Sequence, residues 1–292
     1  MKSQKIQFAN SNGEMLSGVL ETPTTGLRGW ALFAHCFSCS KNTLAATRIA
    51  RELAVLGIGT LRFDFTGLGE SEGAFEARGF SGNVDDLIQA ANWMEKNGRR
   101  VELLVGHSLG GAAIIVAAGH LPQVQAVATL GAPADADHVI TQFAHKVPEI
   151  EAQGRAEIDL AGRAFTLEKS FLDDVKQARV REAVATLKRP LLVMHSPIDQ
   201  VVGIDNATDL FLAAKHPKSF VSLDQADHLI SDPDDARAAA DVISAWAGRY
   251  LEPPVEMDTL EPDQGHKVTV RSTGEVSPYQ NELLINGRRF LA

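Results

Sequence analysis

Short apolar runs and longer amphipathic stretches alternate along most of the chain. The apolar runs, which are partly β-branched, predict buried strands at 29–37, 58–65, 101–106, 124–130, 190–195 and 219–223. Between them, apolar residues at helical spacing predict helices at 43–56, 83–97, 111–119 and 234–250. Residues 5–22 alternate around two glycines and predict an opening hairpin. This rhythm predicts an α/β fold, with a mostly parallel central sheet and helices on both faces.

The strand at 101–106 leads directly into the sequence Gly106-His107-Ser108-Leu109-Gly110. This is the G-x-S-x-G pattern, in which a serine stands on a sharp turn between a strand and a helix. Glycine at both ends lets neighbouring backbone come close to the turn. The helix that follows directs its first N–H groups toward the serine hydroxyl. The pattern predicts that Ser108 is a nucleophile.

Two further polar side chains follow strands of the predicted sheet. Asp199 lies in the loop after strand 190–195, and His228 follows strand 219–223. Such sheets bind their ligands at the carboxyl ends of the strands. A serine hydroxyl needs a general base within hydrogen-bond reach, and an imidazole base needs a carboxylate to orient it. We therefore predict a catalytic triad of Ser108, Asp199 and His228, which occur in the chain order Ser, Asp, His.

Other residues compete for the roles of base and acid. Three more histidines stand at strand ends: His35, His107 and His195. Only His228 has the late position that the chain order requires. Three aspartates compete with Asp199: Asp205, Asp224 and Asp227. Asp205 is expected to cap the next helix, and Asp227 adjoins His228 too closely in sequence to face it.

A serine nucleophile also needs N–H donors for the oxyanion that forms on the substrate. The backbone N–H of Leu109, directly after the nucleophile, is one expected donor. The N–H of Phe37 is the expected second donor, because Phe37 stands in the loop after the strand that ends at His35, on the same side of the sheet as the elbow. The alternative is that His35, Cys36 and Phe37 merely end a buried strand.

Together these motifs resemble the α/β-hydrolase-fold serine esterases, in the branch that includes small intracellular carboxylesterases and cinnamoyl (feruloyl) esterases. The resemblance covers roughly residues 5–250. The family's His-Gly-Phe-x-x-Ser loop corresponds to residues 35–40 here, where Cys36 replaces the glycine. Residues 64–73 resemble the loop after the family's fourth strand, which implies that Asp64 frames the site and is not a catalytic acid.

The resemblance implies a cofactor-free serine hydrolase that cleaves carboxylic esters through an acyl-enzyme intermediate. The modest apolar content of residues 133–188 favours a small to medium, uncharged ester. Thioesterase, lactonase, amidase and perhydrolase chemistry would use the same side chains. Serine at the nucleophile position disfavours dehalogenase and epoxide-hydrolase chemistry, for which this fold uses an aspartate. A different class of function is a non-catalytic α/β-hydrolase scaffold that binds a partner domain.

Two other motifs have competing interpretations. The glycines at 67, 69 and 73 have the wrong spacing for a dinucleotide fingerprint, so we exclude NAD binding. Cys36 and Cys39 have the C-x-x-C spacing of a redox pair. We expect instead two small, mostly buried thiols, and no metal site, because a second pair of ligands is missing from the motif.

The strand–helix rhythm breaks at 133–188, which we interpret as a cap insertion in a hydrolase domain that spans 1–250. The cap is expected to contain a small hairpin at 157–160 and 164–167, with short helices on either side. Residues 251–266 have the composition of a linker. Strands are expected at 267–271 and 282–291, in a tail (267–292) that resembles the start of an OsmC-like domain in bacterial bifunctional hydrolases. This predicts a truncated two-domain protein, with a possible homodimer through the tail.

The charge and composition of the chain limit the classes of molecule that it is expected to bind. The chain has 292 residues and a formal net charge of −9, which disfavours nucleic acid and anionic membranes as main partners. Residues 1–6 lack the apolar core of a signal peptide, and no apolar run reaches the roughly 18 residues of a membrane span. We expect a cytoplasmic protein with a small-molecule substrate.

Overall fold

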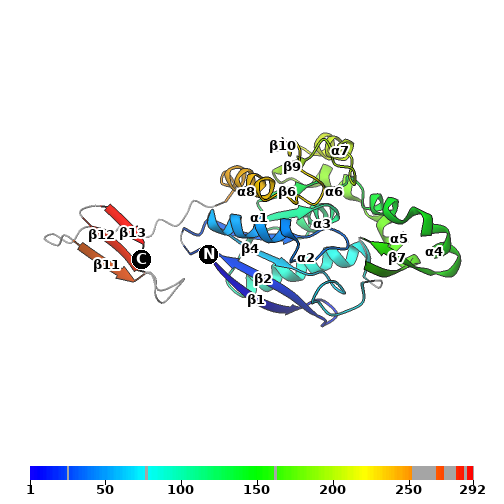
Figure 1. The fold of residues 1–292 in the computed structure, drawn as a ribbon, viewed down its shortest axis with the longest axis horizontal. Helices are drawn as coiled ribbons and strands as arrows, with labels where there is room; N and C mark the ends of the chain where they lie inside the picture. The colour runs from blue at the N-terminus through cyan, green and yellow to red at the C-terminus, as the bar shows by residue number, and fades with distance from the viewer. Residues whose placement is uncertain are drawn as a thin grey trace.

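A computed structural model describes residues 1–24, 26–75, 78–160, 163–251, 268–272, 281–285 and 288–291. An eight-stranded sheet, in the order β1-β2-β4-β3-β5-β6-β9-β10, forms its centre (Figure 1). The strands are β1 (Lys2–Ala9), β2 (Met15–Thr22), β3 (Gly29–Ala34), β4 (Ile58–Phe63), β5 (Val101–His107), β6 (Ala126–Leu130), β9 (Leu191–His195) and β10 (Lys218–Ser222). The opening hairpin β1–β2 and the β2–β4 pair are antiparallel, and every other pair is parallel. The predicted mostly parallel α/β sheet is therefore confirmed.

Helices cover both faces of this sheet, because successive strand residues point to opposite sides. In β5, Leu104 packs into one apolar core, whereas Leu103 and Val105 pack into the other. One face carries α1 (Leu44–Val55) and α8 (Pro233–Ala247). The opposite face carries α2 (Gly79–Lys96), α3 (Leu109–Ala118), α6 (Val180–Thr186) and α7 (Asp205–Ala213).

The bounds of the four predicted helices differ from the sequence expectation by one to four residues, and the largest difference is at the start of α2. Helix α2 begins at Gly79, four residues before the predicted start, because Phe80 is buried and extends the apolar face toward the N-terminus. The expectation that Asp205 caps α7 is wrong. The N-cap residue is Ile204, and Asp205 is the first helical residue. There its carboxylate still faces the positive end of the helix dipole.

The segment between β6 and β9 contains the predicted hairpin and short helices. Besides α6, it contains the 3₁₀ helix η2 (Ala136–Lys146), α4 (Val147–Gln153), the antiparallel pair β7 (Arg155–Leu160) and β8 (Arg163–Glu168), and α5 (Lys169–Gln177). These elements lie together at one end of the central sheet (Figure 1). Rings from the segment, Phe143, Phe165 and Phe171, pack with Phe75 in an aromatic cluster. The segment is thus attached to the rest of the domain by apolar packing.

The tail forms a three-stranded antiparallel sheet of β11 (Val268–Ser272), β12 (Asn281–Ile285) and β13 (Arg288–Leu291). The prediction of one strand over 282–291 is wrong, because two antiparallel strands occupy this stretch. The intervening sequence, Asn-Gly at 286–287, is a common hairpin-turn dipeptide. Apart from Leu251, the predicted linker 251–266 lies outside the described residues. The OsmC-like resemblance and the homodimer stay predictions.

None of the helices in the described ranges is both long and apolar enough to span a bilayer. The cytoplasmic location stays a prediction.

Candidate active site

Ser108 stands on the turn between β5 and α3 in a conformation that L-residues rarely adopt, with φ of 54°. Such strain is maintained only where the surroundings impose it, and here it accompanies a serine on the wall of a cavity. The flanking glycines are required by space. A Cβ at Gly106 would lie 2.6 Å from the carbonyl oxygen of Gly110, and a Cβ at Gly110 would collide with the carbonyl oxygen of His35. The backbone therefore presses the elbow against the loop after β3.

The three side chains predicted as a triad form a continuous hydrogen-bonded chain. The Nε2 atom of His228 lies 3.0 Å from Oγ of Ser108, and its Nδ1 atom lies 2.7 Å from Oδ2 of Asp199. The other carboxylate oxygen, Oδ1, accepts hydrogen bonds from the N–H groups of Val201 and Val202 at 2.8 and 2.9 Å. Three strand ends, those of β5, β9 and β10, thus bring together residues far apart in sequence. Their catalytic role stays a prediction.

The competing residues have other partners. Oδ1 of Asp227 accepts the N–H of Ser231 at 2.8 Å, which fixes the loop after His228. Nδ1 of His35 contacts the carbonyl oxygen of Cys36 at 2.8 Å, and Nε2 of His195 contacts that of Val202 at 2.7 Å. None of these contacts reaches Ser108.

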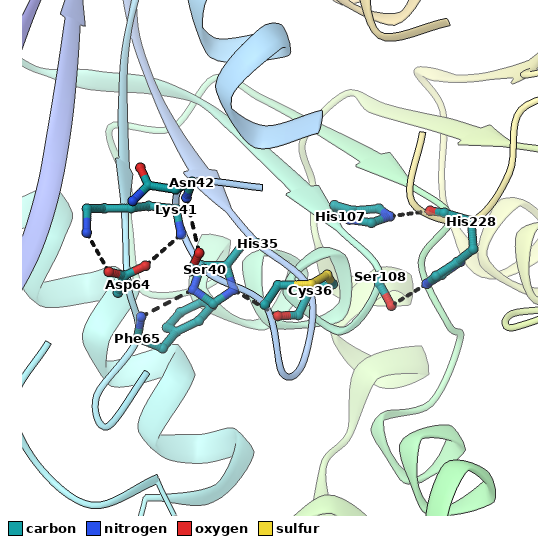
Figure 2. Close-up of a disulfide and its surroundings, with 11 residues drawn as sticks. His35, Cys36, Ser40, Lys41, Asn42, Asp64, Phe65, His107, Ser108 and His228 are labelled. Atoms are coloured by element: carbon teal, nitrogen blue, oxygen red, sulfur yellow. Dashed lines mark hydrogen bonds and ion pairs between the residues drawn. A yellow bond between two sulfur atoms is a disulfide. The ribbon is translucent and has the colours of Figure 1, made fainter. Parts of the chain in front are cut away.

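His107 has a role that the sequence analysis missed. Burial lowers the pKa of its imidazole to about 4, so the ring is neutral at physiological pH. Its Nε2 atom lies 2.6 Å from the backbone oxygen of His228 (Figure 2), and a neutral ring places its proton there. This contact positions the backbone of His228 opposite the elbow. Only the tertiary fold reveals it, since the two residues lie 121 positions apart.

The carboxylate of Asp199 is held in its charged form. Burial alone would raise its pKa, but hydrogen bonds from His228 and from the N–H groups of Val202 and Val201 outweigh that effect. The pKa of Asp199 therefore lies below its ordinary value. A permanent negative charge at this point favours the Nδ1–H tautomer of His228 and leaves Nε2 free to accept a proton from Ser108.

The predicted oxyanion donors are available. No hydrogen bond within the described residues uses the N–H of Phe37 or of Leu109. The ring of Phe37 is 5% exposed and packs against Phe75 and Phe171, with ring centroids 5.3 and 5.4 Å apart. Because Phe171 belongs to α5, the segment between β6 and β9 helps to hold the loop that carries the Phe37 N–H.

A buried ion pair anchors the far end of this loop, and sequence reasoning missed it. Nζ of Lys41 lies 2.6 Å from Oδ2 of Asp64, with side chains 1% and 0% exposed (Figure 2). The backbone N–H of Lys41 donates to Oδ1 of the same carboxylate, and the N–H of Glu70 donates to Oδ2. Asp64 is thus fully used as a scaffold, which agrees with the framing role that the resemblance implied for it.

The expectation of two free thiols is wrong, because Cys36 and Cys39 form a disulfide. The loop after β3 turns sharply and places their Cα atoms 5.2 Å apart, within the range that a disulfide spans. Cys36 is buried, whereas Cys39 is half-buried. The C-x-x-C spacing was the only signal of this bond in the sequence.

A cavity of about 560 Å³ opens over these groups. Ser108 and His228 lie on its wall with the disulfide, and Leu44, Val201 and Leu229 contribute apolar side chains. Gln142 of η2 adds a polar group from the segment between β6 and β9. Among the described residues, the lining includes no Asp, Glu, Lys or Arg. Among all the residues that the structure describes, no three His, Cys, Asp or Glu side chains lie close enough together to hold a metal ion.

Comparison with known proteins agrees with the fold described above. The solved esterase domain of a Rhodothermus marinus protein is 46% identical in sequence, and the match covers 86% of this chain and 99% of that one with a TM-score of 0.70. Est1E from Butyrivibrio proteoclasticus, solved with ferulic acid bound, is 19% identical over 84% of this chain and 98% of its own. Its TM-score of 0.69 shows a shared fold.

Among characterised sequences, the mitochondrial palmitoyl-protein thioesterase ABHD10 of Mus musculus is 24% identical over 209 residues, which is 68% of this chain and 68% of its own. The sequence profile of the alpha/beta hydrolase family matches residues 29–276. The fold, the elbow and this match lead to one conclusion: the chain belongs to the alpha/beta hydrolase family.

Proposed function

We propose that this protein is a serine carboxylic-ester hydrolase. The observation that carries the proposal is the hydrogen-bonded chain from Ser108 through His228 to Asp199, on the wall of an apolar cavity. A non-catalytic scaffold would not require this arrangement, in which a strained serine contacts one nitrogen of an imidazole and a buried carboxylate contacts the other. The similarity to the Rhodothermus marinus esterase domain supports the same reaction class.

In the proposed mechanism, Nε2 of His228 takes the proton of Ser108 as Oγ attacks the ester carbonyl carbon. The N–H groups of Phe37 and Leu109 hold the oxyanion that develops on the carbonyl oxygen. The tetrahedral intermediate collapses, and the imidazolium gives its proton to the leaving alcohol. A water molecule, deprotonated by His228, then hydrolyses the acyl-enzyme and regenerates the Ser108 hydroxyl. Asp199 stabilises the imidazolium in both halves of the reaction.

The cavity supports a small to medium, uncharged substrate. Burial of a charged group against a wall without formal charges would cost several kcal/mol. Leu44 and Leu229 remain 57% and 53% exposed, so the cavity mouth offers apolar surface to an acyl chain or an aromatic group. The solved complex of Est1E with ferulic acid is consistent with an aromatic acyl group.

A thioester is the second candidate substrate class. The similarity to palmitoyl-protein thioesterase ABHD10 favours it, and the same side chains serve both reactions. An oxygen ester and a thioester with the same acyl chain separate the two candidates. The substrate class with the higher kcat/KM is the preferred one.

Fluorophosphonate labelling tests the proposal directly. We expect covalent label on Ser108 of the wild type and none on Ser108→Ala, together with loss of p-nitrophenyl ester turnover. Ser40→Ala is the matched control, because Ser40 lines the same cavity and has no contact with His228. It should still be labelled at Ser108. Wild type that resists the label would instead support a non-catalytic scaffold.

A further inference from the structure

The Cys36–Cys39 disulfide closes the turn that carries one of the proposed oxyanion donors. The N–H of Cys39 donates to the carbonyl oxygens of Cys36 and Phe37, at 3.2 and 2.5 Å, so the disulfide and these backbone contacts hold the same four residues. Phe37 lies inside this turn. Both cysteines and Ser108 line one cavity, and Figure 2 shows the Cys36 side chain beside Ser108. Reduction of this disulfide would therefore change the wall of the cavity that contains Ser108.

Both cysteines line the cavity, and Cys39 is the more exposed residue of the two. Cys36 is 6% exposed, whereas Cys39 is half-buried and also lines the cavity. Exchange requires the incoming thiolate to reach a sulfur atom, so Cys39 is the site of attack. The chain has two cysteines in all, so no third thiol of this chain can intercept the exchange.

We propose that Cys36–Cys39 is a thiol–disulfide exchange site that couples the redox state of the surroundings to hydrolysis at Ser108. This inference rests on the proposed function. The oxidised form has the turn closed and the Phe37 N–H in place. The reduced form keeps the fold but holds this donor less firmly.

The exchange balances with small thiols as the reductant. A thiolate attacks Sγ of Cys39, forms a mixed disulfide and breaks the Sγ–Sγ bond. Sγ of Cys36 leaves with the electron pair and takes a proton from water. A second thiolate then attacks the reductant's sulfur in the mixed disulfide, which forms the small disulfide and releases Cys39, also to be protonated. The protein gains two electrons and two protons, and two thiols become one disulfide.

The expected effect of reduction is partial, because other contacts hold the loop. The His35 ring contacts the carbonyl of Cys36, and the ring of Phe37 is packed between Phe75 and Phe171. Complete loss of an oxyanion donor lowers kcat by about 10²–10³-fold. We expect a loosened donor to lower kcat by about tenfold, with KM changed less than twofold because the donor acts on the oxyanion and not on the ground state.

The experiment equilibrates the wild type in mixtures of reduced and oxidised dithiothreitol. The thiol count after acid quench and alkylation should pass from zero to two, and kcat for p-nitrophenyl butyrate should fall along the same curve. The double variant Cys36→Ser/Cys39→Ser should have the low kcat of the reduced form at every mixture. If the thiol count reaches two with kcat unchanged or raised, the coupling is refuted. If the disulfide resists reduction until the protein unfolds, the exchange site is refuted.

One further sample separates this inference from the proposed function. Ser108→Ala should complete the same thiol titration without hydrolytic activity. If the wild type shows no hydrolysis and no fluorophosphonate label at any mixture, the proposed function fails, whatever the thiol count. Because the titration of the wild type needs no variant, poor folding of the double variant would leave the test intact.

Discussion

Replacement of Asp199 by asparagine probes the proposed reaction most sharply, because it changes one atom in a site whose other contacts are fixed. Oδ1 of Asp199 accepts the N–H groups of Val201 and Val202, and only Oδ2 contacts His228. In Asp199→Asn, the amide oxygen must remain with the two backbone donors. The amide NH₂ then points at Nδ1 of His228, where the carboxylate stood.

That exchange reverses the tautomer of the imidazole. With a donor at Nδ1, the ring carries its proton on Nε2 and donates to Oγ of Ser108, so it is no longer a base for the hydroxyl. Loss of the correct tautomer in a serine protease triad lowers kcat by about 10⁴-fold, which corresponds to about 5 kcal/mol of transition-state stabilisation. Stability should change by only about 1 kcal/mol, because each hydrogen bond is kept and only its charge assistance is lost.

The assay is p-nitrophenyl ester turnover, with urea unfolding as the measure of stability. Asp227→Asn is the matched control. Asp227 is adjacent to His228 in sequence, accepts a backbone N–H from Ser231 and does not contact the imidazole. It should keep kcat within about threefold of the wild type. Asp199→Asn with kcat within tenfold of the wild type, or Asp227→Asn with the larger loss, would refute the reasoning.

Three other outcomes follow from buried and exposed contacts. Lys41→Met leaves the Asp64 carboxylate buried without its cation and should lower the free energy of unfolding by about 3–5 kcal/mol. The exposed pair Lys169–Asp173 is its control, and Lys169→Met should cost less than about 1 kcal/mol in the same urea titration. His107 is neutral in the folded protein at pH 7, because its pKa is about 4 there and 6.5 in the unfolded chain. The free energy of unfolding should therefore fall by about 3 kcal/mol as the pH drops from 6.5 to 4. His107→Asn should remove this part of the dependence of stability on pH. Leu229→Ser at the cavity mouth should raise KM about threefold to tenfold for an octanoate ester but less than twofold for acetate, because only the longer chain covers that surface.

The positions of the strands along the chain and the elbow were predictable because their signals are local. Apolar runs separated by amphipathic stretches are typical of buried parallel strands and covering helices, and the elbow needs glycines at fixed positions. The position of Asp199 and His228 close to Ser108 was predictable for a related reason. A residue that follows a parallel strand must lie at the same edge of the sheet as every other residue that does so.

The sequence analysis missed, or predicted wrongly, the features that depend on contacts between residues far apart in the sequence or on the exact path of a loop. The ion pair of Lys41 with Asp64 and the contact of His107 with the backbone of His228 join segments that only folding brings together. The disulfide depends on how tightly the loop turns after β3, which composition does not determine. The sequence by itself thus determined the α/β architecture, the strained serine and the edge of the sheet where the chemistry lies. The tertiary structure alone decided how that edge is held rigid, because buried charges, neutral imidazoles and loop closures depend on distances in space rather than on positions along the chain.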